Sequence, residues 1–166
     1  MADSNVQEIL KKAMLLEQQG MNFYGQVAAQ TESDAVKNIF SIMAEEEKKH
    51  YEALKEQYKR YESEGKFSLD ESLGSPNEFS EKVLSEKIRS EINAANFEAA
   101  SISAAIGMER EAIALYSDRA EKAEDPNEKK IYRELAAWEN THVSFLNEIY
   151  NDLLEDSWYD ANFWPF

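Results

Sequence analysis

Both histidines of this 166-residue chain lie three residues after a glutamate, in stretches with helical periodicity. Residues three apart on a helix project side by side, so a Glu-x-x-His sequence can offer a carboxylate and an imidazole to one metal ion. The chain has no cysteine, which excludes thiolate ligands, disulfides and iron–sulfur sites. A metal would therefore be held by oxygen and imidazole nitrogen, which suits iron, manganese or zinc. The two stretches are Glu47-Lys48-Lys49-His50 and Glu139-Asn140-Thr141-His142.

Each motif has a further glutamate 30 residues upstream of its own, Glu17 for the first and Glu109 for the second. One Glu-x-x-His in a glutamate-rich helix is usually an exposed charge pair, but two copies with matched upstream glutamates indicate a metal site. A carboxylate can bridge two ions, so this set suits a pair of metals about 3.5 to 4 Å apart. We expect two terminal carboxylates, two bridging carboxylates and one imidazole per ion: Glu17 and Glu109, Glu47 and Glu139, and His50 and His142, respectively.

These six residues lie on the apolar stripes of four segments that we expect to be helices. Within each stripe the residues advance in steps of three and four, which keeps them on one helix face. Burying four carboxylates there without cations would cost several kcal/mol per ion, more than a marginally stable domain can absorb. The stripes are Val6, Leu10, Ala13, Glu17, Gly20, Tyr24 and Val27; Val36, Phe40, Met43, Glu47, His50 and Leu54; Ile102, Ala105, Glu109, Ala112, Tyr116 and Ala120; and Tyr132, Leu135, Glu139, His142, Leu146, Ile149 and Leu153.

Capping residues and helix breakers indicate where these helices begin and end. Ser4 and Ser33 are the expected N-caps of the first two helices, and the second pattern breaks at Gly65. Before the fourth helix, Asp125 is an expected N-cap, followed by a proline at the first helical position and by Glu128 three residues after the cap.

The second half of the chain repeats the first with an offset of 92 residues and without a gap. A repeated helix pair predicts an all-α four-helix bundle with approximate two-fold symmetry, in which two equivalent half-sites face each other. The matched pairs are Glu17 and Glu109, Tyr24 and Tyr116, Ser33 and Asp125, Ile39 and Ile131, Ala44 and Ala136, Glu47 and Glu139, His50 and His142, and Leu54 and Leu146.

The chain is expected to form one domain, since neither half has enough core to fold alone. The helix pairs would occupy about residues 4–63 and 94–154, joined by a long crossover with one short helix at about 64–93. Residues 155–166 form an aromatic tail that cannot continue a helix past Pro165. We expect this tail to fold over the bundle or onto another subunit, and both options stay open.

The net charge of −15 would repel phosphate backbones and anionic membrane surfaces, so nucleic acid and membrane are not expected partners. No stretch approaches the roughly 18 apolar residues needed to span a bilayer. The charged, amphipathic beginning of the chain has no apolar signal-peptide region, so we expect a cytoplasmic location.

Four stretches carry a resemblance to the ferritin-like, rubrerythrin-type superfamily of carboxylate-bridged dimetal proteins, which covers about residues 6–154. Residues 16–24 and 108–116 are similar to the first and third helices of rubrerythrin-like proteins, and residues 44–50 and 136–142 resemble the second and fourth. Two features depart from that pattern. The chain lacks the cysteines of a rubredoxin-like domain, so electrons would come from an external donor. Alanine occupies position 112, where rubrerythrins carry an additional glutamate.

The six-ligand set and the resemblance together imply a non-haem di-iron oxidoreductase of peroxidase or oxidase type, acting on hydrogen peroxide or oxygen. Two iron ions are the expected cofactors, with manganese or a mixed pair left open, and a homodimer is expected. Ferritin-like iron binding with Fe(II) oxidation and dimanganese catalase-like activity are the alternatives. Tyr24 and Tyr116 lie seven residues after Glu17 and Glu109. We expect core aromatics whose hydroxyls bond a buried neighbour rather than redox-active tyrosines, with orientation of a carboxylate as a further role.

Overall fold

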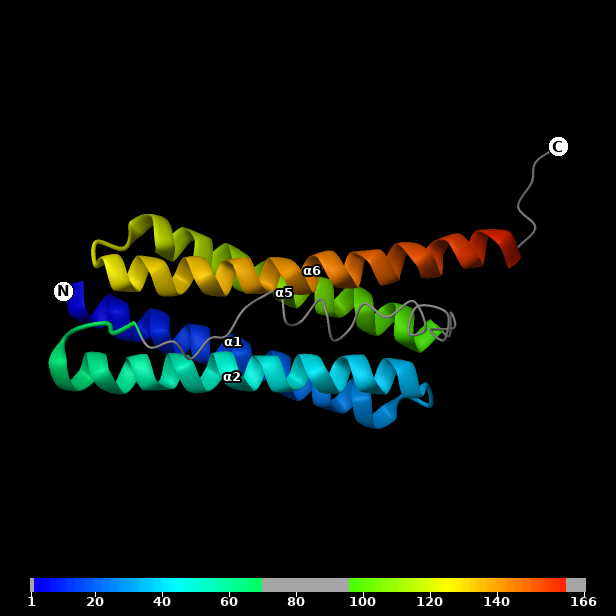
Figure 1. Ribbon diagram of the computed structural model, residues 1–166, viewed down its shortest axis with the longest axis horizontal. Coiled ribbons are helices and arrows are strands. Elements are labelled where there is room, and N and C mark those ends of the chain that lie inside the picture. The colour runs from blue at the N-terminus through cyan, green and yellow to red at the C-terminus, as the bar shows by residue number, and fades with distance from the viewer. Residues whose placement is uncertain (1, 70–95, 161–166) are drawn as a thin grey trace.

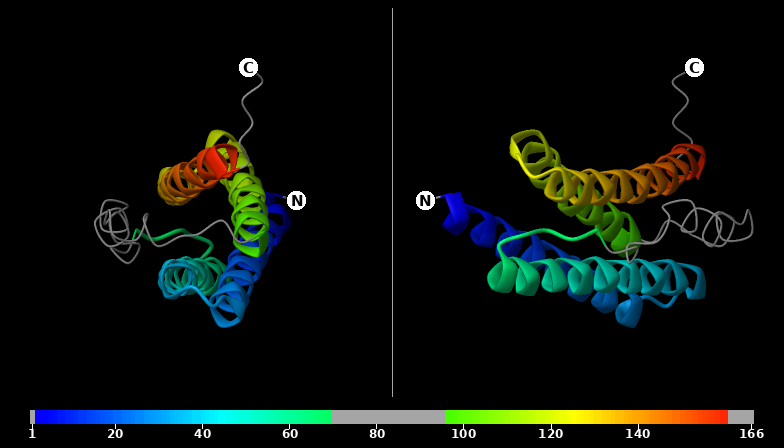
Figure 2. Two further views of the ribbon diagram at one scale, coloured as in Figure 1. Left: turned by 90° about the vertical axis from the view of Figure 1, so that its right-hand side faces the viewer. Right: turned by 60° about the vertical axis from the view of Figure 1, so that its left-hand side comes forward.

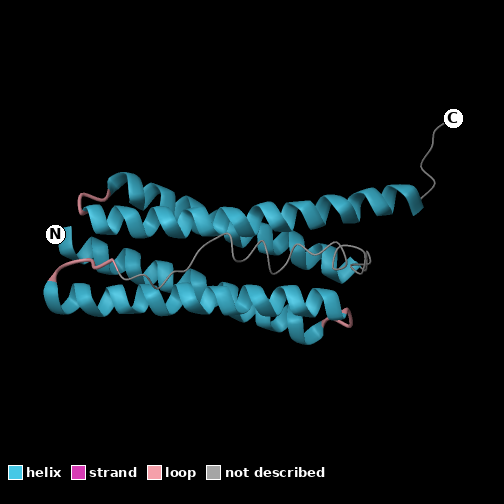
Figure 3. Ribbon diagram, viewed as in Figure 1, coloured by secondary structure: helices cyan, strands magenta, loops and turns pink. Residues whose placement is uncertain are grey.

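A computed structural model describes residues 2–69 and 96–160 of the chain. These residues form four long helices and no strand (Figure 3), which confirms the all-α four-helix prediction. The predicted short helix of the crossover and the last six residues of the aromatic tail lie outside the described residues. The helices are α1 (Ala2–Gln30), α2 (Asp34–Glu64), α5 (Asn96–Lys122) and α6 (Pro126–Asp160).

The helices form two antiparallel hairpins, α1 with α2 and α5 with α6 (Figure 1). Helix α2 ends at one end of the bundle and α5 begins at the other, so α1 and α5 run in opposite directions. Contacts between α1 and α5 join the hairpins, and the view along the bundle shows these two helices side by side (Figure 2). This is the two-fold arrangement expected from the repeat.

Every residue of the four predicted stripes is buried. The apolar ones form two separate clusters, one containing Tyr24 and Phe40 and the other containing Leu10 and Tyr116. The six predicted ligands belong to neither cluster and lie buried between the two. Among the described helices, none combines the length and the apolar character that crossing a membrane requires.

Local hydrogen bonds explain three of the helix ends. Ser33 caps α2 as predicted, since its hydroxyl oxygen accepts from the backbone N–H of Val36 at 3.3 Å. Gly65 ends this helix in the left-handed conformation, with φ of 65°, and its N–H donates to the carbonyl of Tyr61 at 2.9 Å. Asp125 begins α6, because its carboxylate accepts backbone N–H groups 2.7 and 3.2 Å away.

Three details differ from the sequence-based prediction. Helix α1 begins at Ala2, so the prediction that Ser4 caps it is wrong. Polar residues also suit the first helical turn, where backbone N–H groups lack helical acceptors, so residue type alone did not fix this end. Helix α6 continues to Asp160 rather than ending near residue 154. Glu128 pairs with Arg119 of α5 instead of serving only its own helix start.

Candidate metal centre

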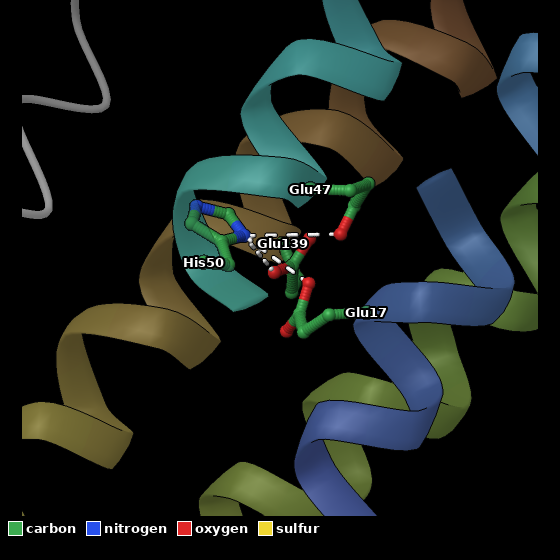
Figure 4. A group of neighbouring side chains, drawn as sticks. All are labelled: Glu17, Glu47, His50 and Glu139. Atoms are coloured by element: carbon green, nitrogen blue, oxygen red, sulfur yellow. Dashed lines mark ion pairs between the residues drawn. The ribbon is translucent and has the colours of Figure 1, made fainter. Parts of the chain in front are cut away.

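Six buried polar side chains converge at the middle of the bundle, from all four helices. Figure 4 shows four of them, with Glu17 from α1 facing Glu47 and His50 of α2 and Glu139 of α6. Both histidines are 0% exposed and no glutamate of the six exceeds 3%. The helical spacing explains the convergence, because each residue occupies an inward position of its apolar stripe. The six are Glu17, Glu47, His50, Glu109, Glu139 and His142.

The side chains form two overlapping groups of four, and two glutamates are common to both. Within each group, one ligand atom per residue lies within 4.8 Å of all the others. Glu47 and Glu139 are the shared members. The first group adds Glu17 and His50, and the second adds Glu109 and His142. The structure therefore brings together all six residues that the sequence singled out, with the predicted pair of glutamates between the halves.

The imidazoles face the carboxylates through the Nδ1 atom. Nδ1 of His50 lies 2.9 Å from Glu139 Oε1 and 3.4 Å from Glu17 Oε2. Nδ1 of His142 lies 3.0 Å from Glu139 Oε2, 3.3 Å from Glu109 Oε1 and 3.4 Å from Glu47 Oε1. The two rings are 6.1 Å apart between centroids. Glu139 thus presents one oxygen to each histidine.

Two tyrosine hydroxyls support the terminal glutamates, and each bond joins the two helix pairs. Tyr24 of α1 donates to Glu109 of α5, and Tyr116 of α5 donates to Glu17 of α1. Burial, and then the charge of the glutamate that each tyrosine contacts, raise the pKa of both phenols well above their ordinary value. Both hydroxyls therefore remain protonated and act as donors.

Neighbouring charges divide the buried carboxyl groups into two kinds. Burial raises the pKa of Glu17 and of Glu109 well above the ordinary value, and the charges of the two shared glutamates add to this effect. Burial also acts to raise the pKa of Glu139, but the two histidines outweigh it and hold this pKa far below its ordinary range. Without a cation, Glu17 and Glu109 are therefore the carboxyl groups of the cluster whose raised pKa favours the protonated form.

Neighbouring carboxylates raise the pKa of both histidines. Burial acts to lower the pKa of His50, but the neighbouring Glu139 and Glu17 outweigh it and raise this pKa well above its usual value. Glu109 and Glu139 have the same effect on His142. A metal ion would displace these protons, because carboxylates and neutral imidazoles are the forms that bind metals.

The donor atoms fit such ions. Oε2 of Glu17, Oε1 of Glu47 and both oxygens of Glu139 are buried and accept no hydrogen bond of normal geometry from the described residues. Unsatisfied buried carboxylate oxygens are costly unless a cation or a donor satisfies them. Each group of four supplies three carboxylates and one imidazole, which suits iron or manganese.

One neighbour of the site escaped the sequence analysis. The indole of Trp138 packs edge-on against the His50 ring, with 5.3 Å between centroids. Trp138 occupies the position that Glu46 holds in the first half of the repeat. Both side chains are buried. The change from glutamate to tryptophan between the two halves of the repeat was the signal in the sequence that the surroundings of the two histidines differ.

The comparisons with known proteins agree with this geometry. The sequence matches the model of the family described as Rubrerythrin over residues 8–150, a span that contains all six clustered residues. Neither the curated proteins nor the solved structures gave a match. The family match, the four-helix fold and the buried cluster point the same way. The chain belongs to the rubrerythrin family, a family of ferritin-like di-iron proteins.

Proposed function

We propose that the cluster binds two iron ions and that the protein reduces hydrogen peroxide or oxygen with electrons from an external donor. The observation that carries this proposal is the pair of four-residue groups that share Glu47 and Glu139. Two ions held by common carboxylates lie close enough to act on both oxygens of one small molecule.

In this proposal, each ion has its own terminal carboxylate and imidazole. Glu17 and His50 would hold one ion, and Glu109 and His142 would hold the other. Glu47 and Glu139 would contribute to both, which is supported by the position of the Glu139 oxygens at 2.9 and 3.0 Å from the two histidines.

Iron would supply one electron per ion, which together meet the two-electron reduction of peroxide to water. The protein's own residues prepare the site for that reaction. The tyrosine hydroxyls orient Glu17 and Glu109, and burial excludes bulk water from all six ligands. In this proposal an external donor restores the electrons, since these 166 residues contain no cysteine to hold an iron–sulfur or rubredoxin-type centre.

Oxidation of Fe(II) in the ferritin manner is the second candidate. The observation that favours it is the buried Ala112, which offers no carboxylate at the position where rubrerythrins carry an additional glutamate. A site with six rather than seven protein ligands has less means to retain oxidised iron. A dimanganese site with catalase-like activity is the third candidate and uses the same ligands.

Metal analysis paired with rapid mixing distinguishes these candidates. The metal-free protein is loaded with Fe(II), its iron content per chain is measured, and the reduced protein is mixed with peroxide and with oxygen separately. We expect two iron ions per chain and faster oxidation by peroxide than by oxygen. Oxidation of the iron without repeated turnover when a reductant is supplied would favour Fe(II) oxidation in the ferritin manner, and manganese in protein isolated without added metal would favour the third candidate. Failure to consume either oxidant would refute the proposal.

A further inference from the structure

A small cavity between α1 and α5 connects the cluster with the surface. Its volume is about 30 Å³, enough for one water-sized occupant. The buried glutamates Glu17, Glu47 and Glu109 line its inner part. Gln19 and Glu111, both exposed, line its outer part. The cavity therefore leads from the solvent to carboxylates of both four-residue groups.

The walls of this cavity come from equivalent positions of the two helix pairs. Leu16 pairs with Met108 under the 92-residue offset, and Gln19 pairs with Glu111. Gly20 and Ala112 form a third pair of this kind, and both are buried. The cavity thus lies between equivalent segments of the two helix pairs and reaches the terminal glutamate of each half, Glu17 and Glu109.

Small residues keep the inner part of the cavity open. A Cβ atom at position 20 would lie 3.3 Å from Cδ of Glu47, closer than most real Cβ contacts. Glycine therefore leaves the Glu47 carboxylate uncovered on this side. Ala112, which lines the cavity from α5, contributes only a methyl group. The other directions are more closed, since an apolar cluster covers the site toward each end of the bundle and Trp138 covers His50.

The charge of the lining favours a cation. Four of the residues around the cavity are glutamates, and no described residue that lines it is basic. Oε2 of Glu17 and Oε1 of Glu47 accept no hydrogen bond of normal geometry from the described residues although both are buried. Acidic clefts concentrate cations and raise their association rates. An anion would meet repulsion along the same path.

We propose that this cavity is the port through which a divalent metal ion reaches the site, and that Glu111 captures the ion at its mouth. The Gly20 and Ala112 pair keeps the passage open to the shared carboxylate of Glu47. This inference rests on the proposed function in one respect, because it takes the six-residue cluster to be the destination of the metal.

The test follows the uptake of Co(II) by the metal-free protein, with the absorbance of the bound ion recorded after rapid mixing. Glu111→Gln should slow uptake by roughly threefold to tenfold at low ionic strength. Gln19→Glu places a second carboxylate at the equivalent position and should accelerate uptake by a similar factor. Both effects should shrink at high salt, because solvent-exposed charges are screened. All proteins should still bind two ions per chain at equilibrium.

Two matched variants control for net charge and for side-chain volume. Glu121→Gln removes the same charge at an exposed position ten residues farther along α5, and it should load at the wild-type rate. Ala112→Leu fills the passage and should slow uptake at every salt concentration, whereas Ala114→Leu adds the same volume at an exposed position and should not. If Ala112→Leu does not fold, the charge variants at positions 19 and 111 decide the question.

The outcomes separate the port from the proposed function. Wild-type rates in the Glu111, Gln19 and Ala112 variants, with two cobalt ions bound per chain, would overturn the port and leave the metal site intact. A wild-type protein that takes up no cobalt would overturn both. Slower loading of Glu111→Gln and Glu121→Gln alike would mean that net charge, and not this cavity, controls uptake.

Discussion

The terminal glutamates of the cluster are held by tyrosines of the opposite helix pair. Glu109 accepts a hydrogen bond from Tyr24, and Glu17 accepts one from Tyr116. Hydrogen bonds to metal-binding carboxylates fix their orientation, and their loss typically weakens metal binding by about 10- to 100-fold. Removal of one tyrosine hydroxyl is therefore the smallest change that tests the site while every metal ligand remains.

Tyr24→Phe should weaken metal binding by about tenfold or more, because the Glu109 carboxylate loses the donor that orients it. A competition titration against a metal chelator measures the change. Tyr132→Phe is the matched control, since the buried Tyr132 hydroxyl has no hydrogen-bond partner among the described residues. Equal affinities of the two variants would show that the hydroxyl of Tyr24 does not support the site.

Glu139 contacts both histidines, whereas each histidine serves one group of four. Glu139→Ala should therefore reduce binding at both positions, while His50→Ala should leave one ion bound through the group that contains His142. Elemental analysis of the two loaded variants checks this difference. If Glu139→Ala kept one tightly bound ion, the carboxylate would not be shared.

At the scale of the helices, the buried face of each helix was the feature that the sequence predicted best. All residues on the predicted stripes are buried. Residues spaced three and four apart lie on one face of a helix, and an apolar face packs against the neighbouring helices. The caps Ser33 and Asp125 were also predicted, since their side chains bond backbone groups within three residues. Such local contacts can be recognised without knowledge of the neighbouring helices.

Contacts between helices could not be predicted in the same way. The sequence placed Tyr24 and Tyr116 on the inward stripes, but not opposite the glutamate of the other pair. Trp138 was missed because its importance depends on where α2 brings His50. Glu128 was recognised as part of a helix start, but its pairing with Arg119 depends on the turn between α5 and α6. These contacts follow from packing geometry, which sequence spacing does not contain.

Gly20→Ala tests how closely α1 approaches the site. The added methyl group would lie 3.3 Å from Cδ and 3.5 Å from Oε2 of Glu47, so the carboxylate must shift. We expect the equilibrium affinity for metal to fall by roughly tenfold. The same competition titration measures it, with the helix content followed by circular dichroism.

Gly107→Ala provides the control on another helix. This glycine is exposed and a Cβ atom there would meet nothing within 4 Å. Alanine should raise the free energy of unfolding by about 0.5 to 1 kcal/mol through helix propensity and leave metal affinity unchanged. Unchanged affinity in both variants would show that Glu47 moves freely away from α1.

At the scale of the whole molecule, a polar layer separates two apolar clusters. Helix propensity and the apolar clusters stabilise the metal-free fold, but the layer between them gathers four carboxyl groups out of water. Protons and metal ions compete to satisfy these groups. The stability of the molecule should therefore depend on pH in opposite directions with and without metal.

The metal-free protein should lose stability as pH rises from 5 to 8. Glu17, Glu109, His50 and His142 have raised pKa values, so each binds its proton more tightly in the folded state. Their contribution is complete below the ordinary values of 4.5 for glutamate and 6.5 for histidine, and it is lost as pH rises through the raised values. Thermal unfolding across this range measures the trend.

Metal should reverse this trend, because its binding requires the same protons to leave. The gain in Tm on metal loading should grow from pH 5 to pH 8, and removal of the metal by a chelator should abolish it. Glu17→Gln should flatten the slope for the metal-free protein, since glutamine does not titrate. A metal-free protein whose Tm rises steadily between pH 5 and 8 would contradict this account.

The crossed tyrosine bonds also bear on the origin of the chain. Because each hydroxyl reaches a glutamate of the other helix pair, one pair alone cannot complete either half of the site. Two identical polypeptides of half the length could complete it only as a symmetric dimer. Duplication and fusion of such a gene would preserve the interface while freeing the two copies to evolve apart. Glu46 and Trp138, at equivalent positions of the repeat, show that the two halves differ in the present chain.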